Sequence, residues 1–346
     1  LQNKIAPQTV GIALNIGLPV AFGGALYNCS AFLADGKILG FVAKQHLAGD
    51  GVHYEPRFFK AWPANLRAEV ELPDGTRAPI GDLDFDLAGI RVGFEICEDA
   101  WVANRPGIAL AQKAVDVILN PSASHFAFGK TKTRERFVLE GSRAFHCAYA
   151  YANLLGNEAG RVIYDGDGLL AHEGTMLKRL PRLTFADWTL ESAVVDLQVS
   201  QMMRYRQTSF EPRFEAAAVK SDFALLIKKS PVQTSGLERE AWENSADITF
   251  EEFQRAEELG LWDYLRKARQ RGYALSLSGG ADSAACAALV AGMVKRAYAE
   301  CADRLREVLA LKPKATLKEA LKAALVCVYQ PTKNSGKVTL SAAKNL

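Results

Sequence analysis

Thirty consecutive residues near the start of the chain, from position 5 to position 34, carry no charged side chain. A run of this length has to be buried, either in a lipid bilayer or in the core of a folded protein. Adjacent glycines at 23 and 24 interrupt it, and glycine pairs form turns between strands. We therefore predict buried β-strands at 12–16 and 31–33, and not a signal peptide or a transmembrane helix.

The overall composition narrows the class of protein further. The 346 residues are 49% hydrophobic and 23% charged, as in folded globular proteins, which excludes a disordered or fibrous chain. The net charge of +3 is too small to predict a nucleic-acid or anionic membrane partner. Six cysteines without a C-x-x-C pair exclude a disulfide scaffold and a cysteine zinc site, and they favour a reducing, cytoplasmic location.

Short apolar runs alternate with helical patterns along the first two hundred residues, which is typical of a layered α/β domain. We predict strands at 90–96, 115–120, 161–164 and 194–197, and helices at 102–114 and 133–153. Prolines and scattered charges follow, with a weak strand pattern at 223–227. We predict a first domain over 1–215 and a linker over 216–248.

A second domain is predicted over 249–346. Thr249-Phe-Glu-Glu252 has the pattern of a capping box, and apolar residues then recur at helical spacing at 253, 256, 259, 262 and 265. Strands at 272–277 and 324–329 should enclose a helix at 283–299 and further helical residues at 302–323. The order strand, helix, strand predicts the beginning of a parallel sheet.

The sequence Leu277-Ser-Gly-Gly-Ala-Asp-Ser283 lies between a predicted strand and a predicted helix. Adjacent glycines let the backbone approach a ligand, and N–H groups at a helix N-terminus attract phosphate. The pattern is neither a Walker loop nor a dinucleotide fingerprint. A bound Mg²⁺ would explain the acid Asp282 beside a phosphate. The alternative is an ordinary glycine-rich turn.

Cys97 ends a predicted strand within Glu95-Ile-Cys-Glu-Asp99, where a thiolate could attack a carbonyl to form a thioester. The alternative is a small buried cysteine. Neighbouring carboxylates disfavour a thiolate, so the site needs a cation. Lys44 could supply it and stabilise an oxyanion, with Glu55 orienting the lysine, although both residues could instead be solvated.

A third motif, Asn120-Pro-Ser-Ala-Ser124, ends the strand that is predicted to neighbour the Cys97 strand, and Lys130 and Arg134 follow it. Hydroxyl groups and a cation at this sheet edge would suit an amino-acid substrate. A helix N-cap formed by Ser122 or Ser124 is the alternative.

Together these motifs resemble the nitrilase superfamily followed by the loop of the ATP pyrophosphatases. Their order over nearly the whole chain is similar to that of the glutamine-dependent NAD⁺ synthetases. The resemblance implies an α/β fold in which a nitrilase-type αββα sandwich precedes the start of a Rossmann-like parallel-sheet ATP pyrophosphatase domain.

The resemblance also implies roles for individual residues. Cys97 would be the glutaminase nucleophile, Lys44 its stabilising lysine and Glu55 an auxiliary glutamate, while Glu98, Ser124 and Lys130 would hold glutamine. Deamido-NAD⁺ and ATP-Mg²⁺ would be the other substrates of a cytoplasmic homo-oligomer assembled through its nitrilase domains. Asp282 would lie on the magnesium side of the ATP site, whose expected residues are Ser276, Leu277, Ser278, Gly279, Gly280, Ala281, Asp282 and Ser283.

The sequence departs from the family pattern in three respects. We expect the base glutamate of the family before Leu1 and the deamido-NAD⁺ contacts beyond Leu346, and Asp50 stands six residues after Lys44, where a tyrosine is common. Two alternatives stay open. The chain could belong to another adenylating glutamine amidotransferase, or it could be a catalytically silent scaffold with the same fold.

Overall fold

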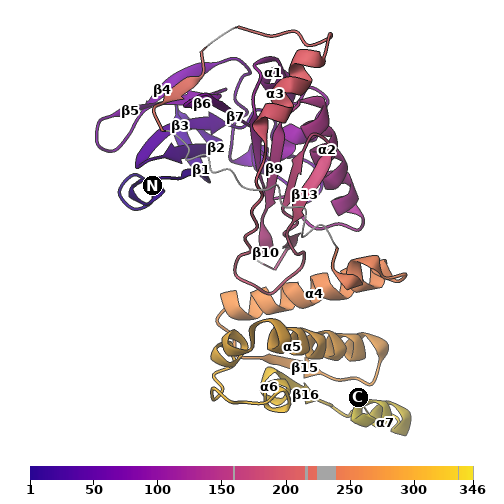
Figure 1. Ribbon diagram of the computed structural model, residues 1–346. Coiled ribbons are helices and arrows are strands. Elements are labelled where there is room, and N and C mark those ends of the chain that lie inside the picture. The colour runs from indigo at the N-terminus through magenta and orange to yellow at the C-terminus, as the bar shows by residue number, and fades with distance from the viewer. Residues whose placement is uncertain (159, 215–216, 224–238, 334, 346) are drawn as a thin grey trace.

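The computed structural model describes residues 1–158, 160–214, 217–223, 239–333 and 335–345. These residues form two parts, which lie one above the other in Figure 1. The first part is a sandwich of two β-sheets with helices on one side. The second part is a group of helices around a short parallel sheet.

The charge-free segment forms the first two strands of a five-stranded sheet. β1 and β2 pair antiparallel over their whole length around the turn at Gly23 and Gly24, both of which have positive φ. Pro19 lies within β1, which is tolerated because β1 is an edge strand. The prediction of strands is confirmed, although both are longer than expected. The sheet has the order β1 (Ala13–Phe22), β2 (Ala25–Ala34), β3 (Lys37–Ala43), β5 (Arg77–Gly81) and β4 (Arg67–Glu71).

The second sheet has seven strands, and its centre is parallel. β8 pairs parallel with both β7 and β9, so the carboxyl ends of these three strands meet at one edge. The strand order is β13 (Thr175–Arg179), β12 (Leu169–His172), β9 (Ala148–Asn153), β8 (Val117–Ser122), β7 (Ile90–Phe94), β6 (Phe85–Leu87) and β14 (Val219–Ser221).

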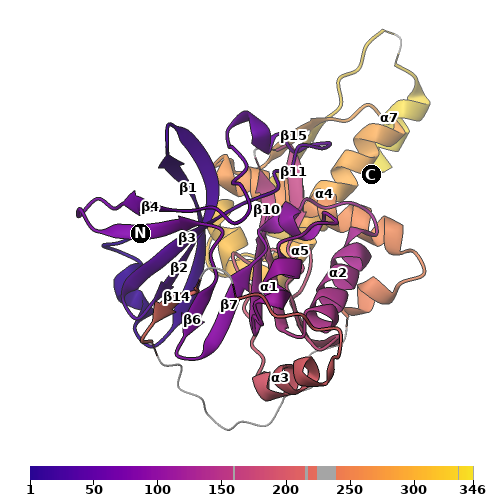
Figure 2. The same cartoon turned by 90° about the horizontal axis from the view of Figure 1, so that it is seen from above.

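Apolar side chains from both sheets fill the space between them. The ring of Phe32 lies 4.9 Å from that of Phe85 and 5.3 Å from that of Phe94, measured between centroids. Each of these side chains contributes about 1.5–3 kcal/mol through burial. On the other face of the seven-stranded sheet lie α1 (Gly107–Gln112), α2 (Lys130–Ala144) and α3 (Leu197–Arg206), as Figure 2 shows.

The helices of the first part differ from the prediction in three places. The helix predicted over 133–153 ends at Ala144, because the alternating residues Ala148–Asn153 form the parallel strand β9. The strand predicted over 194–197 is wrong, since Asp196 caps α3 by accepting a hydrogen bond from the Gln198 N–H at 3.0 Å. The helix predicted over 102–114 is confined to α1.

Part of the predicted linker belongs to the first part of the structure. β14 pairs parallel with β6, so residues 219–221 extend the seven-stranded sheet. The weak strand pattern predicted at 223–227 lies, from residue 224 on, outside the described residues. Trp242, on the 3-10 helix η4 (Ala241–Asn244), packs into the apolar core of the second part.

The second part contains the predicted parallel pair of strands. β15 (Tyr273–Ser276) pairs in parallel with β16 (Leu325–Val328), on which Val326 and Val328 are exposed. Residues 302–323 do not form one helix, because one helix ends at Val308 and the next begins at Leu317. The helices are α4 (Ile248–Lys267), α5 (Ala281–Val308), α6 (Leu317–Ala324) and α7 (Lys337–Asn345).

The capping box predicted at Thr249 is wrong. Helix α4 begins at Ile248, so Thr249 already lies inside its first turn. The buried carboxylate of Glu252 instead accepts a hydrogen bond from Arg182 at 2.9 Å. An ion pair between the two parts has therefore replaced the local cap that the sequence suggested.

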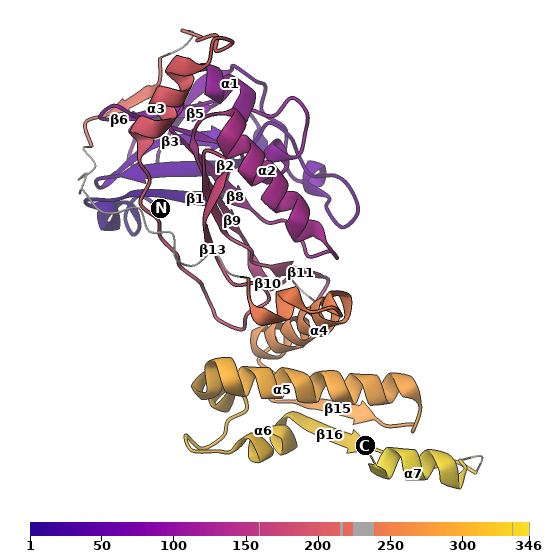
Figure 3. The same cartoon turned by 45° about the vertical axis from the view of Figure 1, so that its right-hand side comes forward.

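A hairpin joins the sandwich to α4. Its strands are β10 (Leu155–Glu158) and β11 (Val162–Asp165), and Figure 3 shows the hairpin lying directly on the helix. The Asn157 N–H donates to the buried carboxylate of Asp263 at 2.7 Å. A Cβ atom at Gly156, whose φ is +116°, would lie 2.3 Å from the same carboxylate. The contact therefore requires glycine at position 156.

None of the helices in the described part of the chain has both the length and the apolar character needed to cross a bilayer.

Leu259→Ala should destabilise the second part of the structure. Leu259 is fully buried on the apolar face of α4, so its truncation should cost about 2–5 kcal/mol of unfolding free energy. Phe253→Ala is the matched control, because Phe253 is 49% exposed on the same helix. Urea denaturation of both variants tests this, and an equal loss for Phe253→Ala would contradict the packing described.

Candidate active site

Cys97 occupies a sharp turn at the carboxyl edge of the parallel strands. It begins the 3-10 helix η3 (Cys97–Ala100) three residues after β7 ends, and its φ is +50°. This left-handed backbone is uncommon for a residue other than glycine. Strain of this kind is maintained when surrounding contacts fix it, and it occurs often at functional sites. The Cys97 N–H donates to Asn120 Oδ1 at 3.3 Å, at the end of the neighbouring strand β8.

A buried hydrogen-bond network stabilises the turn at Cys97. The carboxylate of Glu95 is buried and accepts from Arg105 Nε at 2.8 Å and from the Tyr149 hydroxyl at 2.5 Å. The same hydroxyl accepts from Asn120 Nδ2 at 2.9 Å. A continuous set of polar contacts therefore runs from Arg105 to the backbone of Cys97, and such fully satisfied networks fix one conformation.

Lys44 is buried and paired with Glu55, so the solvated alternative for Lys44 is wrong. The distance from Lys44 Nζ to Glu55 Oε2 is 2.6 Å. Glu55, on the 3-10 helix η2 (Glu55–Arg57), also accepts from Asn28 Nδ2 at 2.6 Å and from the Ala48 N–H at 2.8 Å. These contacts hold the ammonium group in one place.

Lys44, Glu55 and Cys97 line one cavity of about 800 Å³. Ligand pockets in proteins usually have volumes of about 300–1,000 Å³. The cavity can therefore hold a small substrate beside a thiol and a fixed cation. This is the arrangement required to attack a carbonyl carbon and stabilise the resulting oxyanion.

Asp99 connects the turn at Cys97 to the residues that follow Lys44. One carboxylate oxygen accepts from the N–H groups of Gln45 at 3.2 Å and His46 at 2.8 Å, directly after Lys44. The other accepts from the Ile96 N–H at 3.0 Å, directly before Cys97. Burial raises the pKa of Asp99 to about 7. Sequence reasoning assigned Asp99 no role, although it ends the motif that singled out Cys97.

The three residues expected to hold glutamine do not line this cavity in the described part of the chain. Ser124 is buried, and its hydroxyl accepts from Arg134 at 3.3 Å. Lys130 Nζ lies 5.4 Å from the centre of the Trp101 ring. Burial raises the pKa of the half-buried Glu98 and lowers that of Lys130. The structure thus brings the three expected catalytic residues to one cavity and leaves the three expected glutamine-holding residues outside its lining.

Other polar residues that line the cavity were not predicted from the sequence. They come from the loop before η2, from the end of β9 and from the β10–β11 hairpin, and they include His53, Asn153, Glu158, Arg161 and Tyr164. The Tyr164 hydroxyl donates to Glu158 at 2.8 Å. Their positions follow no helical or strand period, so no local pattern could have revealed them.

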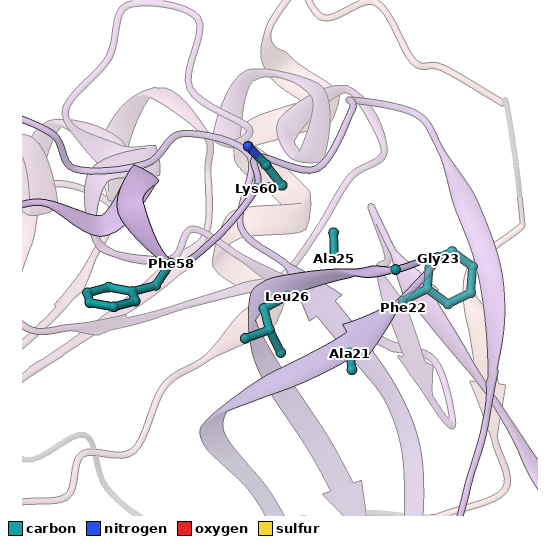
Figure 4. A pocket seen from close by; sticks show the side chains of 8 residues that line it. Ala21, Phe22, Gly23, Ala25, Leu26, Phe58 and Lys60 are labelled. Atoms are coloured by element: carbon teal, nitrogen blue, oxygen red, sulfur yellow. The ribbon is translucent and has the colours of Figure 1, made fainter.

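A second hollow, of about 530 Å³, lies at the β1–β2 turn and is shown in Figure 4. Apolar side chains such as Leu26 and Phe58 line it, together with one cation, Lys60. No cysteine, serine or threonine is among the described residues that line it. Phe58 lines both cavities, so the hollow adjoins the Cys97 cavity without sharing its chemistry.

The glycine loop of the second part connects β15 to α5, as expected. Gly279 has φ +79°, and the hydroxyls of Ser278 and Ser283 lie 3.1 Å apart. Asp282 is exposed at the start of α5 and pairs with no basic side chain among the described residues. A cavity of about 170 Å³ separates the loop from α7, whose Thr339 carbonyl would lie 2.3 Å from a Cβ atom at Gly279.

Comparison with known proteins identifies the first part of the structure. Residues 4–207 match the carbon-nitrogen hydrolase family. A glutamine-dependent NAD⁺ synthetase of Saccharomyces cerevisiae is 31% identical over an alignment of 311 positions, which covers 85% of this chain and 43% of the relative. The chain thus spans about half the length of the curated relatives it matches.

Two solved structures resemble the whole chain. A glutamine-dependent NAD⁺ synthetase from Cytophaga hutchinsonii is 36% identical with a TM-score of 0.74, covering 99% of this chain and 51% of its own. A glutamine-dependent NAD⁺ synthetase from Acinetobacter baumannii in complex with ADP is 21% identical with a TM-score of 0.64, covering 99% of this chain and 49% of its own. The second likeness shows the fold alone.

These findings confirm the resemblance and the fold class that the motifs predicted. The matched residues include Lys44, Glu55 and Cys97, together with both sheets except β14. The match extends over more than half of the chain. The chain therefore belongs to the carbon-nitrogen hydrolase family.

Proposed function

We propose that this chain is part of a glutamine-dependent NAD⁺ synthetase. The Cys97 cavity hydrolyses glutamine, and the ammonia is used for the ATP-dependent amidation of deamido-NAD⁺ to NAD⁺. The main support is the placement of Cys97 beside the Lys44–Glu55 ion pair in one cavity. The names of the relatives and the glycine loop that follows in the same chain agree with this function.

In the glutaminase half, Cys97 Sγ attacks the side-chain amide carbon of glutamine. A C–S bond forms and the C–N bond breaks, and the thiol proton is transferred to the amide nitrogen, which leaves as ammonia. Water then hydrolyses the thioester to glutamate and restores the thiol. Lys44 donates to the oxygen that becomes negative in each tetrahedral intermediate. Because Glu55 already holds the ammonium group, little reorganisation is needed when this charge appears.

Glu98 and Lys130 are suited to the two charged groups of glutamine. An amino acid carries an ammonium and a carboxylate, so an acid and a base near the nucleophile complement it. Burial and Arg134 lower the pKa of Lys130 against the opposing influence of Cys97, Asp165 and Glu98, which supports its proximity to the nucleophile. Ser124 would contribute through its position in the loop, since its hydroxyl already accepts from Arg134.

In the synthetase half, the loop Ser276–Ser283 binds ATP, which adenylates deamido-NAD⁺ and releases pyrophosphate before ammonia displaces AMP. The N-terminus of α5 favours phosphate at this position. Asp282 offers an exposed hard-oxygen ligand that fits Mg²⁺, which would neutralise phosphate charge. A nucleotide needs more room than about 170 Å³, so binding requires α7 to move away from Gly279.

We further propose a cytoplasmic homo-oligomer that assembles through the carbon-nitrogen hydrolase domain and has no nucleic-acid or membrane partner. All six cysteines are free thiols, in agreement with a reducing compartment.

We also propose the domain limits 1–215 and 249–346. The pairing of β14 with β6 carries the first domain into the expected linker.

Cys97→Ala should abolish NAD⁺ formation from glutamine and leave formation from ammonium unchanged, because only the nucleophile of the glutaminase half is lost. The test uses the full-length enzyme with deamido-NAD⁺, ATP and each nitrogen source. Cys327→Ala, at an exposed position, is the control. Equal loss with both nitrogen sources would rule out two separate sites.

Asp282→Ala should reduce NAD⁺ formation from both nitrogen sources at least about tenfold, because a ligand of the proposed ATP-Mg²⁺ site is lost. Activity is measured over a range of Mg²⁺ concentrations. Asp303→Ala, at an exposed position on the same helix, should leave activity unchanged. An Asp282→Ala enzyme with normal turnover would contradict the metal-side role.

Asp99→Asn should lower kcat for glutamine hydrolysis about 10–100-fold with little change in KM, because an amide group would direct N–H against a backbone N–H and shift Lys44 relative to Cys97. NAD⁺ formation from ammonium should persist. A change in KM alone would show that Asp99 does not set the catalytic geometry.

A further inference from the structure

Two histidines from separate segments are in contact beside the Cys97 cavity. His53 lies in the loop before η2 and lines the cavity, and His125 follows the motif at the end of β8. The distance from His53 Nε2 to His125 Nδ1 is 2.8 Å. Arg134 fixes the His125 backbone by donating to its carbonyl oxygen at 3.0 Å.

Lys130 determines which nitrogen atoms carry protons. Its ammonium group lies 3.3 Å from the same His125 Nδ1 and can only donate. His125 Nδ1 is therefore an acceptor, and its ring proton lies on Nε2. His53 must then donate through its own Nε2 proton. In a neutral imidazole this leaves Nδ1 of His53 without a proton, as the one ring nitrogen still able to accept a hydrogen bond.

The surroundings keep both rings neutral. Burial lowers the pKa of His53, as do Lys130 on α2 and Lys44 after β3, against the opposing charges of Glu55 and Glu158. Burial also lowers the pKa of His125 to about 4, together with Lys130, His53 and Arg134, against Asp165. Protonation of either ring would place a second positive charge near the ammonium group of Lys130.

We propose that His53 is a substrate-contacting residue whose Nδ1 accepts a hydrogen bond from an N–H group of glutamine, and that His125 and Lys130 are the positioning residues that hold His53 as the neutral Nε2–H tautomer. This inference rests on the proposed glutaminase function. It adds a specificity-determining acceptor to a cavity in which Lys44 and Cys97 perform the chemistry. Protonation of His53 would turn this acceptor into a donor and repel the ammonium group of the substrate.

Amide side chains can replace the two ring nitrogens one at a time. His53→Gln keeps a donor at the Nε2 position and loses the Nδ1 acceptor, so KM for glutamine should rise about tenfold. His53→Asn keeps an acceptor near the Nδ1 position and should retain more affinity than His53→Gln. His172→Gln is the control, since His172 bonds to Ser200 outside this cavity and its loss should not affect glutamine binding.

Two variants of His125 test the positioning residues. His125→Asn keeps an acceptor at Nδ1, and His125→Gln loses it. In His125→Gln the Nε2 proton of His53 has no acceptor, so His53 can take the Nδ1–H tautomer, and KM for glutamine should rise while kcat changes little. His125→Asn should keep the wild-type KM. A purely structural role for His125 would impair both variants equally and would lower kcat as well.

These measurements are made on the full-length enzyme. Their results distinguish failure of the inference from failure of the proposed glutaminase function. Equal KM values for His53→Gln and the wild type, or equal KM values for the two His125 variants, would overturn the inference alone. A wild-type enzyme that forms NAD⁺ from ammonium but does not hydrolyse glutamine would overturn the proposed glutaminase as well. NAD⁺ formation from ammonium verifies that each variant is folded, and if His53→Gln fails this check, the His125 pair decides.

Discussion

The guanidinium group of Arg134 is completely buried, and the arrangement of the site depends on it. Its nitrogens donate to the carboxylate of Asp165 at 2.8 Å and to the carbonyl oxygens of Ser124 at 2.9 Å and His125 at 3.0 Å. Asp165 accepts in turn from Arg182, which also pairs with Glu243 on η4 and with Glu252 on α4. Removing one member of a buried ion pair typically costs about 3–5 kcal/mol, because the remaining charge is left without compensation. One set of charges therefore fixes a loop beside the cavity and joins the two parts of the molecule.

Local patterns predicted most of the fold. Apolar alternation and glycine turns located β1, β2, β7, β11, β15 and β16, because side-chain direction in a strand depends only on neighbouring residues. Predictions from local patterns were wrong where tertiary contacts determined the structure. Residues 148–153 are rich in alanine and tyrosine and were expected to continue a helix, but they pair with β8 at the centre of the sheet. Glu252 had the spacing of a cap and instead binds Arg182, which lies seventy residues earlier.

The candidate site divides in the same way. Cys97 could be found because a cysteine at a strand end has a known chemical use, and Lys44 followed from the need for a cation. Asp99 and His53 could not be found, since their roles depend on backbone N–H groups and on a ring more than fifty residues away. The sequence therefore predicts the atoms that are proposed to react. The groups that orient those atoms can be recognised only from the three-dimensional structure.

The parallel pair β15 and β16 has a practical consequence. In the described residues this sheet has two strands, and Val326 and Val328 are exposed on β16. Free backbone N–H and C=O groups beside exposed valines are a template for pairing with another chain. A preparation of these 346 residues would thus tend to self-associate through its second part, and light scattering would detect that association.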